Sequence, residues 1–289
     1  MDPQLIVNGI ALGSIIALGA VGLTLTCGIL RLSNFAHGDL MTLGAFVAWM
    51  VNRSPIPVLN NIWVSMLVGI VATVGVALLT EAILWKRMRR VRATSTTLVI
   101  ISIGLALFLR NGILLIWGSD AKRFNLPIAS AIDVFGIKIK FYNLVVLGLA
   151  LVAIAALHFL LQNTKIGKAM RAVADDIDLA RVTGINVEQV VLWTWMIAAS
   201  LTGLGGQMYG LVTNVRPDMG WLLILPMFAA VTLGGIGNPY GAIAGAFIIG
   251  IAQEVSVPIV GSQYKLAVAL ILMVLTLLFR PQGLFRGTA

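Results

Sequence analysis

Four ionisable residues interrupt the long apolar segments of this 289-residue chain: Glu81, Arg110, His158 and Glu254. If these segments cross a membrane, such a side chain either pairs with an opposite charge or lines a water-filled path. Glu81 lies about a turn before Lys86, and His158 lies near the end of its segment, so both are expected to reach the membrane interface. Arg110 and Glu254 are deeper and are candidates for an ion pair or for a translocation path.

The sequence carries no catalytic constellation. It has no HExxH or GxSxG motif, and Gly167-Lys168 is followed by Ala169 and lacks the upstream glycine of a Walker A loop. Cys27 is the only cysteine, so neither a disulfide framework nor a metal site is expected. We therefore expect a protein that is not an enzyme and that holds no cofactor or metal. Any ATP that drives it would be bound and hydrolysed by another chain.

The composition predicts an integral membrane protein. Hydrophobic residues make up 59% of the chain and charged residues 11%, and the mean hydropathy is +0.99. Soluble domains carry about 25% charged residues. At about 20 residues per span, the length predicts one transmembrane domain over residues 1–289, an all-α bundle of about eight to ten helices. The net charge of +9 is explained by basic residues in loops that orient the protein in the membrane. It does not indicate nucleic-acid binding, because the chain has no soluble fold that could present a basic face.

Nine apolar segments are candidates for spans. Two of them, residues 38–51 and 221–233, are shorter than about 18 residues and are expected to be half-helices or re-entrant segments. The N-terminus lacks the positive region of a cleavable signal peptide, so the first segment is expected to remain as a span. The other seven segments are 5–25, 62–85, 94–117, 142–161, 190–212, 240–257 and 265–279.

Basic residues predict the orientation. Residues 86–92 directly follow a span and are rich in Lys and Arg, and further basic residues lie in a long polar loop (162–189) and in the C-terminal tail at Arg280 and Arg286. The positive-inside rule places all three regions in the cytoplasm, with the N-terminus outside and the C-terminus inside. Residues 118–141 then fall outside, although Lys122, Arg123, Lys138 and Lys140 lie among them.

The polar loop (162–189) is expected to form two short helices. Ile166, Ala169, Met170 and Val173 fall on one helical face. Asp175 or Asp176 can cap a second helix over residues 177–183, in which Leu179 and Val182 share a face. Gly184 suits its C-terminal cap, and Asn186 can cap the next span. Such a loop either docks on a soluble partner or is a passive amphipathic connector on the lipid surface.

Two polar breaks divide apolar segments. The first is residues 31–39, which contain Asn34 and His37, and the second is residues 233–242. The second contains Gly234, Gly235, Gly237 and Asn238, so a continuous helix is not expected there. Non-helical backbone at membrane depth is tolerated where protein or a water-filled cavity covers it. The breaks are therefore either plain surface turns or parts of an internal repeat around a translocation path.

Together these residues resemble the membrane permease subunit of bacterial ABC importers for branched-chain and other neutral amino acids. The resemblance covers nearly the whole chain. It is carried by LSNFAHGD (32–39), TxxGKAMRAVADD (164–176), AxxxGIN (180–186), AVTLGGIGNPYGA (230–242) and RPQGLF (280–285).

The resemblance implies a multi-pass protein of the bacterial inner membrane that works as part of a heteromeric importer. A second homologous permease subunit would complete the channel, two ABC ATPase subunits would bind ATP on the cytoplasmic side, and a periplasmic substrate-binding protein would deliver the substrate. The polar loop would dock on an ATPase through Gly167, Arg171, Asp175, Asp176, Ala180 and Gly184. The translocation-path candidates are Asn34, His37, Gly234, Gly235, Gly237, Asn238, Glu254 and Arg110.

The substrate and two competing classes stay open at this level. Neutral or branched-chain amino acids are the first expectation, and urea or short amides are the alternative within the same class. A stand-alone secondary transporter or channel would need an intramembrane carboxylate, for which Glu254 is the deep candidate. A non-transporting scaffold would leave both polar breaks unexplained.

Overall fold

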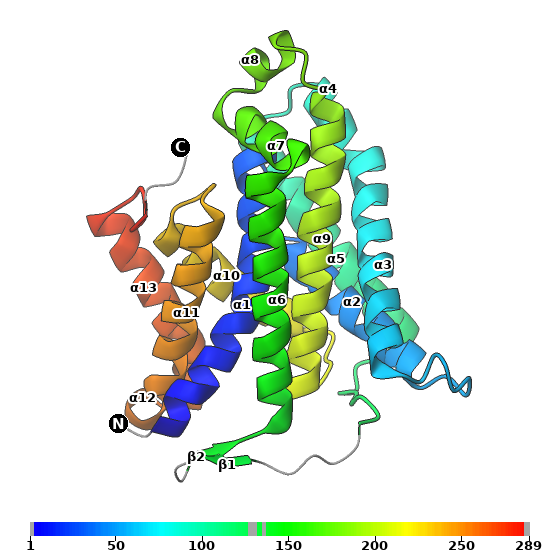
Figure 1. Cartoon of the computed structure of the whole chain (residues 1–289), viewed down its shortest axis with the longest axis vertical. Helices are drawn as coiled ribbons and strands as arrows, with labels where there is room; N and C mark the ends of the chain where they lie inside the picture. Colours follow the sequence, from blue (N-terminus) through cyan, green and yellow to red (C-terminus); the bar gives the residue numbers. More distant parts are fainter. Residues whose placement is uncertain (1–2, 127–131, 135–136, 286–289) are drawn as a thin grey trace.

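The computed structural model describes residues 3–126, 132–134 and 137–285, and most of its regular structure is helical (Figure 1). The long elements are α1 (Pro3–Leu30), α2 (His37–Asn52), α3 (Ile62–Thr80), α5 (Ser95–Trp117), α6 (Phe141–Asn163), α9 (Val187–Val212), α10 (Met219–Gly234), α11 (Pro239–Val255) and α13 (Lys265–Phe279). The short ones are the π-helix η1 (Glu81–Trp85), α4 (Lys86–Arg90), α7 (Lys165–Asp175), α8 (Ile177–Val182), α12 (Val257–Val260), the 3₁₀ turn η2 (Ser262–Tyr264) and the hairpin β1 (Ile132–Val134) and β2 (Ile137–Ile139).

Within the described residues, six helices are long and apolar enough to cross a membrane: α1, the continuous helix Ile62–Arg90, α5, α6, α9 and Ser262–Phe279. Helices α10 and α11 are shorter and apolar, and α2 has 16 residues. The chain is thus a multi-pass membrane protein with an all-α transmembrane part, as the composition predicts. A small hairpin in the 118–141 loop is added to that description. The two segments expected to be short, 38–51 and 221–233, correspond to the 16-residue helices α2 and α10.

Helix α1 is the centre of the bundle. Of its most apolar 18-residue window, 83% is buried, against 22% for α5 and for α6. It packs along α11, and a Cβ on Gly9 would lie 2.7 Å from Ile251 Cα. Small residues four apart let two backbones approach this closely. The helix also continues past the expected end at Leu25 to Leu30, and the buried hydroxyl of Thr26 is satisfied by donating to the carbonyl of Leu23 within the helix.

After α1 the chain turns back into the bundle. His37 is the first residue of α2, and its Nε2 lies 3.0 Å from the carbonyl oxygen of Gly19. At 1.5 Å per residue, Gly19 is about 16 Å below the end of α1. The connecting residues 31–36 are not helical, and the hydroxyl of Ser102 in α5 hydrogen-bonds their backbone at two places. Protein therefore covers this irregular backbone, as membrane depth requires, and α2 begins inside the bundle as a half-helix.

Helix α10 begins beside the first turn of α2. The amide of Gly220 donates to the hydroxyl of Thr42 over 3.0 Å. A Cβ on Gly38 would lie 2.3 Å from the carbonyl oxygen of Gly220, so the two backbones meet without side chains between them. The N-terminal turns of two short helices thus pack against each other within the bundle.

The two ends of the bundle differ in character (Figure 1). One end, called here the loop end, carries α4, α7 and α8, and the opposite end carries the start of α1, the hairpin and α12. The C-terminal turn 280–285 belongs to the loop end, because Leu284 N donates to Leu233 O over 2.8 Å and the neighbouring Asn238 shares a cavity with Arg171. Residues 86–92, the polar loop and the tail therefore lie at one end, as expected; Arg286 lies outside the described residues.

Candidate functional site

The polar loop (162–189) folds as two capped helices, α7 and α8. Thr164 Oγ1 accepts from Gly167 N (3.0 Å) at the start of α7. One carboxylate oxygen of Asp176 accepts from the amides of Asp178 and Leu179, each at 2.9 Å, at the start of α8. These backbone hydrogen bonds hold the pKa of Asp176 below its usual range, the one from Leu179 contributing most. Of the two capping candidates in the sequence, Asp176 is the cap, while Asp175 ends α7 and is exposed.

Helix α7 is fixed to the end of α6. Met170 and Val173 are buried, as the helical stripe predicts. Gly167 lies directly on the backbone of α6, since a Cβ there would be 2.3 Å from Leu161 O. The guanidinium of Arg171 donates to that same carbonyl of Leu161. Helix α7 is therefore packed directly on the end of α6, without intervening side chains at Gly167.

Helix α8 presents an apolar tip. Ala180 is buried beneath it, whereas Leu179 and Val182 are 62% and 84% exposed at the extreme of the loop end. The chain leaves α8 through Gly184, whose φ of 89° is a left-handed conformation that side chains with a Cβ rarely adopt. Ile185 N then bonds Ala180 O over 3.0 Å, and Asn186 caps α9 by accepting from Gln189 N. The N-cap predicted at Asn186 is confirmed, and Gly184 takes the left-handed position directly after Thr183, the C-cap of α8.

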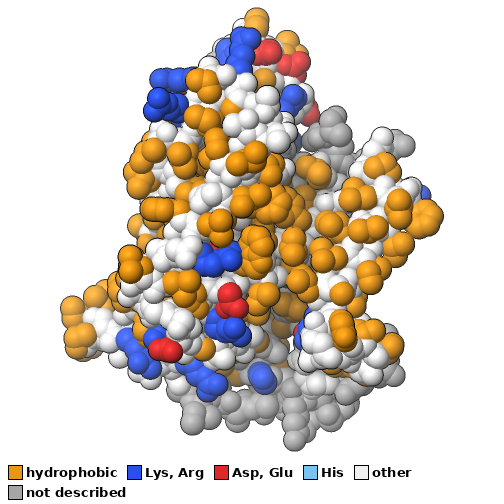
Figure 2. Space-filling model, turned by 180° about the vertical axis from the view of Figure 1, so that it is seen from behind, with side chains coloured by type: hydrophobic (Ala, Val, Ile, Leu, Met, Phe, Trp, Pro, Cys, Tyr) orange, Lys and Arg blue, Asp and Glu red, His pale blue; other side chains and the backbone are white. Residues whose placement is uncertain are grey.

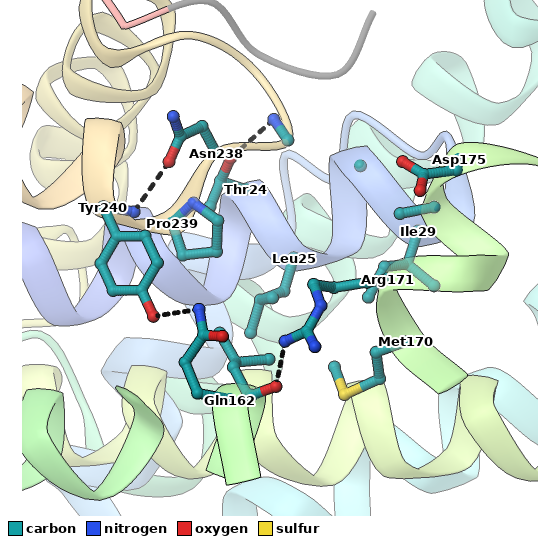
Figure 3. A pocket seen from close by; sticks show the side chains of 14 residues that line it. Thr24, Leu25, Ile29, Gln162, Met170, Arg171, Asp175, Asn238, Pro239 and Tyr240 are labelled. Atoms are coloured by element: carbon teal, nitrogen blue, oxygen red, sulfur yellow. Dashed lines mark hydrogen bonds between the residues drawn. The ribbon is translucent and has the colours of Figure 1, made fainter. Parts of the chain in front are cut away.

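A cavity of about 240 Å³ separates α7 from the turn between α10 and α11 (Figure 3). Leu25 and Ile29 of α1 line it together with Met170, and Arg171 points into it. On the far wall the hydroxyl of Tyr240 accepts a hydrogen bond from Gln162 Nε2 (3.2 Å). The same hydroxyl lies 2.9 Å from His158 Nδ1. His158 is thus tied to α11 near the loop end.

The second polar break lies at this cavity and not at mid-membrane. Gly235 and Gly237 have left-handed φ values in a tight turn, and Gly237 N donates to Thr24 Oγ1 (2.9 Å). Gly234 ends α10, and Asn238 caps α11 by accepting from Tyr240 N and Gly241 N. The two breaks are therefore not equivalent: 31–36 re-enters the bundle, whereas 235–238 is a turn at the loop end. The half-helix that matches α2 is α10, whose start follows Arg216-Pro-Asp218.

His37 and Asn34 lie at the start of α2. His37 Nε2 lies 3.0 Å from Gly19 O and 2.8 Å from Thr202 Oγ1, so it joins α1, α2 and α9. The side-chain oxygen of Asn34 accepts from Ala36 N (3.1 Å), and its buried amide nitrogen has no partner among the described residues. Both side chains are within the bundle, at its most irregular point.

Arg110 and Glu254 do not pair with each other. Arg110 Nε lies 3.4 Å from Asp39 Oδ1, and its guanidinium lies 4.7 Å from the centre of the Trp221 ring. Glu254 instead binds Lys265 at 2.5 Å. An ion pair joining these two deep residues, one of the sequence alternatives, is therefore wrong, because each finds a partner on another element. Asp39, the last residue of the first polar break (31–39), was not among the predicted site residues, although a carboxylate at the edge of an apolar segment could have indicated it.

Glu81, which was expected to reach the membrane interface, lies near the loop end and finds its partners within the protein. It is 3% exposed, its carboxylate binds Arg89, and Trp195 Nε1 donates to it over 2.7 Å. The π-helix η1 begins at this residue. An inward-facing carboxylate near a helix end is thus satisfied by partners within the protein. Within the described residues, no group of three potential metal ligands occurs.

Comparison with known proteins covers almost the whole chain. The family model for the branched-chain amino acid transport system permease component matches residues 5–277. The high-affinity branched-chain amino acid transport system permease protein LivH of Escherichia coli K12 is 31% identical over 97% of this chain and 94% of its own length. BraD of Pseudomonas aeruginosa, of the same description, is 29% identical over the same shares. A probable LivH of Methanocaldococcus jannaschii is 30% identical over 98% and 92%.

Proposed function

This chain belongs to the family of branched-chain amino acid transport system permease components, and we propose that it forms the translocation path of an ATP-driven importer for neutral or branched-chain amino acids. Its partners are a second homologous permease, two ABC ATPase subunits that bind the ATP, and a periplasmic substrate-binding protein. The assembly lies in the bacterial inner membrane, with the loop end in the cytoplasm. The chain itself is a transport subunit and not an enzyme.

The construction of the polar loop carries this proposal. Its tip exposes Leu179 and Val182, while its base is fixed to α6 by Gly167 and Arg171. An exposed apolar tip favours contact with another protein over a passive connector. A base fixed to a span lets a rigid-body movement of that protein reach the membrane helices. If this loop docks on an ATPase, the ATPase covers the apolar tip, and the base passes the movement of the ATPase on to α6.

The junction of α2 and α10 supports a path inside the bundle. Two half-helices meet there through Gly38 and Gly220, and charged and polar side chains gather around them. Broken helices at mid-membrane are the usual setting of substrate sites in transporters, because they expose backbone and helix ends inside the bilayer. We assign His37, Asn34 and Arg110 to this path. Gly234, Gly235, Gly237 and Asn238 are assigned to its cytoplasmic end.

A stand-alone secondary transporter is disfavoured by Glu254. That class needs an intramembrane carboxylate free to bind a proton or sodium ion, and Glu254 is held by Lys265 toward the opposite end of α11. Glu254 is therefore assigned an ion-pair role and is withdrawn from the path. Urea or short amides stay the alternative substrates within the importer class, because the binding protein selects the cargo.

Partner dependence tests the proposal. The full chain is reconstituted in vesicles with and without its ATPase and permease partners, and uptake of labelled leucine and labelled urea is measured with the binding protein present. We expect uptake only with partners and ATP, and leucine preferred over urea. ATP-independent uptake by the chain alone would overturn the importer assignment. A preference for urea would overturn the assignment of amino acids as the substrate.

A further inference from the structure

A second cavity at the loop end is strongly basic. It measures about 660 Å³ and lies between the end of α1, η1 and α4, the α7–α8 pair and the start of α9. Five cationic side chains line it, against the two carboxylates Glu81 and Glu188. The cations are Arg31, Lys86, Arg89, Arg90 and Arg181. Its size falls within the range of about 300–1,000 Å³ that small-molecule sites occupy.

Both carboxylates in this basic cavity are already neutralised. Glu188 binds Lys86 at 3.0 Å, and Glu81 binds Arg89. Within the part of the chain that the structure describes, the side chains of Arg31 and Arg90 make no hydrogen bond or ion pair, and they act on Asp176 and Glu188 only through longer-range charge interactions. Two guanidinium groups are thus left over on the wall of a single cavity, and guanidinium groups bind phosphate oxygens in a forked, directional way.

The backbone also holds Arg31 in an unusual state. Its φ is 51°, in the left-handed region that residues other than glycine seldom occupy. Strained backbone of this kind is retained where the surrounding structure imposes it, and it gathers at binding sites. Here the strain turns the chain from α1 into the re-entrant segment and leaves the arginine side chain exposed at the cavity.

The other half of the cavity is apolar and continues onto the lipid-facing surface. Ile29, Val173 and Val191 line its inner wall, and Ala82 and Leu192 line its outer side. Leu192 is 45% exposed, and next to Ala82 the side chains of Ile83 and Leu79 are 60% and 57% exposed, one turn apart on the same helix. Figure 2 shows hydrophobic side chains over much of the middle of one face and a cluster of Lys and Arg toward its upper end.

From this arrangement we propose that the basic cavity binds an anionic phospholipid of the cytoplasmic leaflet. The phosphate engages Arg31 and Arg90, and an acyl chain follows the exposed strip of Ile83 and Leu79 into the bilayer. Basic cavities between spans on the cytoplasmic side suit such headgroups, because the leaflet supplies them at high local concentration. A soluble anion would use the guanidinium groups but not the apolar strip. The inference does not depend on the transported substrate.

The chain offers a closely matched control for this test. Arg87 lies on α4 beside Arg90, and Arg92 has the same left-handed φ of 51° as Arg31, yet neither lines the cavity. The test pair is Arg31→Asn with Arg90→Gln, and the control pair is Arg92→Asn with Arg87→Gln. Both pairs remove two charges, and asparagine tolerates the left-handed backbone at either position.

Binding is measured on the delipidated full chain by native mass spectrometry, with phosphatidylglycerol, phosphatidylcholine and glycerol phosphate as probes. A basic residue near an anionic lipid surface contributes about a factor of five, so the test pair should weaken phosphatidylglycerol binding about thirtyfold. The control pair should change it by less than about threefold. Equal loss in both pairs, or wild-type binding of phosphatidylcholine as tight as that of phosphatidylglycerol, overturns the site. Glycerol phosphate bound as tightly as the lipid overturns the lipid assignment.

A second measurement needs no variant. Phosphatidylglycerol with a photoactivatable headgroup is added to membranes that contain the assembled wild-type complex, and labelled peptides are identified. We expect labels within residues 29–31, 82–92 and 181–192. Labels confined to other segments would show that a protein partner or nothing fills the cavity, and the proposal would be wrong.

Discussion

Arg110 Nε lies 3.4 Å from Asp39 Oδ1, and this contact joins the α5 span to the first turn of the half-helix α2. The two side chains are only 19% and 1% exposed. One carboxylate oxygen of Asp39 and one terminal guanidinium nitrogen of Arg110 are buried with no hydrogen-bond partner among the described residues. Asp39 also lies at the positive end of the α2 dipole, which favours its charge. The pair therefore fixes the point where the re-entrant segment enters the bundle.

Replacing Arg110 with glutamine should destabilise the protein strongly. The change leaves the carboxylate of Asp39 buried without its counter-ion, and breaking a buried ion pair from one side costs about 3–5 kcal/mol. The double variant Asp39→Asn with Arg110→Gln should recover most of this loss. The free energy of unfolding is measured for each variant in mild detergent with urea.

The ion pair of Glu254 and Lys265 is the control for that experiment. Its lysine is 33% exposed, so Lys265→Gln should lower the free energy of unfolding by less than about 1 kcal/mol. A double variant at Asp39 and Arg110 that is as unstable as Arg110→Gln alone would show that the pair acts through packing and not through its charges.

Replacing Gly220 with alanine should separate the two half-helices. A Cβ there would lie 1.9 Å from the carbonyl oxygen of Gly38, a backbone atom that cannot rotate out of the way as a side chain could. Forcing atoms into a filled interior costs about 1–3 kcal/mol. We expect the free energy of unfolding to fall by that amount and uptake to be lost, as measured by denaturation and by vesicle transport.

Gly104 in α5 is the matched control for Gly220, because a Cβ there would meet nothing within 4 Å. Alanine at position 104 should be neutral or stabilising by about 0.5–1 kcal/mol through helix propensity. If Gly104→Ala and Gly220→Ala behaved alike, the close approach of α2 and α10 would not be a requirement of the fold.

Local features of this protein could be predicted from the sequence. The caps at Asn186 and Gly184 follow from residue types that act on the backbone within a few positions, and the structure has both. The short helices α2 and α10 follow in the same way from the length of their apolar runs. Such signals are contained in the segment itself, so no knowledge of its neighbours is needed.

The pairing of distant residues could not be predicted in this way. Arg110 binds Asp39, 71 positions away, and Glu81 receives the indole of Trp195, 114 positions away. The hydrophobic periodicity and the composition of the sequence indicate that these residues face inward, but they do not indicate which helix each residue contacts. Of the two readings left open for the break at 233–242, the turn is the one the structure has, because Gly235 and Gly237 take left-handed φ values there. The polar residues before α10 gave no comparable signal.

Replacing Asp176 with alanine should loosen α8. The carboxylate caps two backbone amides, and its pKa is lowered by those bonds, so its contribution is present at neutral pH and lost as the pH falls through the lowered pKa. Amide hydrogen exchange in residues 177–182 at pH 7 should therefore become faster. Asp175→Ala is the control and should leave this exchange unchanged, since Asp175 does not cap α8. Equal acceleration in both would point to a general effect of charge.

Replacing Gly184 with valine should uncouple ATP hydrolysis from uptake. Nothing lies within 4 Å of a Cβ at this position, so the cost comes from the φ of 89° alone, and a β-branched residue tolerates it least. Gly184→Asn keeps the left-handed conformation at small cost and is the control. In the assembled importer we expect the valine variant to lose most uptake while the ATPases still turn over, and the asparagine variant to retain both. Because the strain is confined to the exit of α8, the spans should assemble normally in both variants, which a pulldown of the partners checks. Normal uptake by an assembled valine variant would mean that the position of the α8 tip does not matter, and the docking role of the polar loop would have to be abandoned.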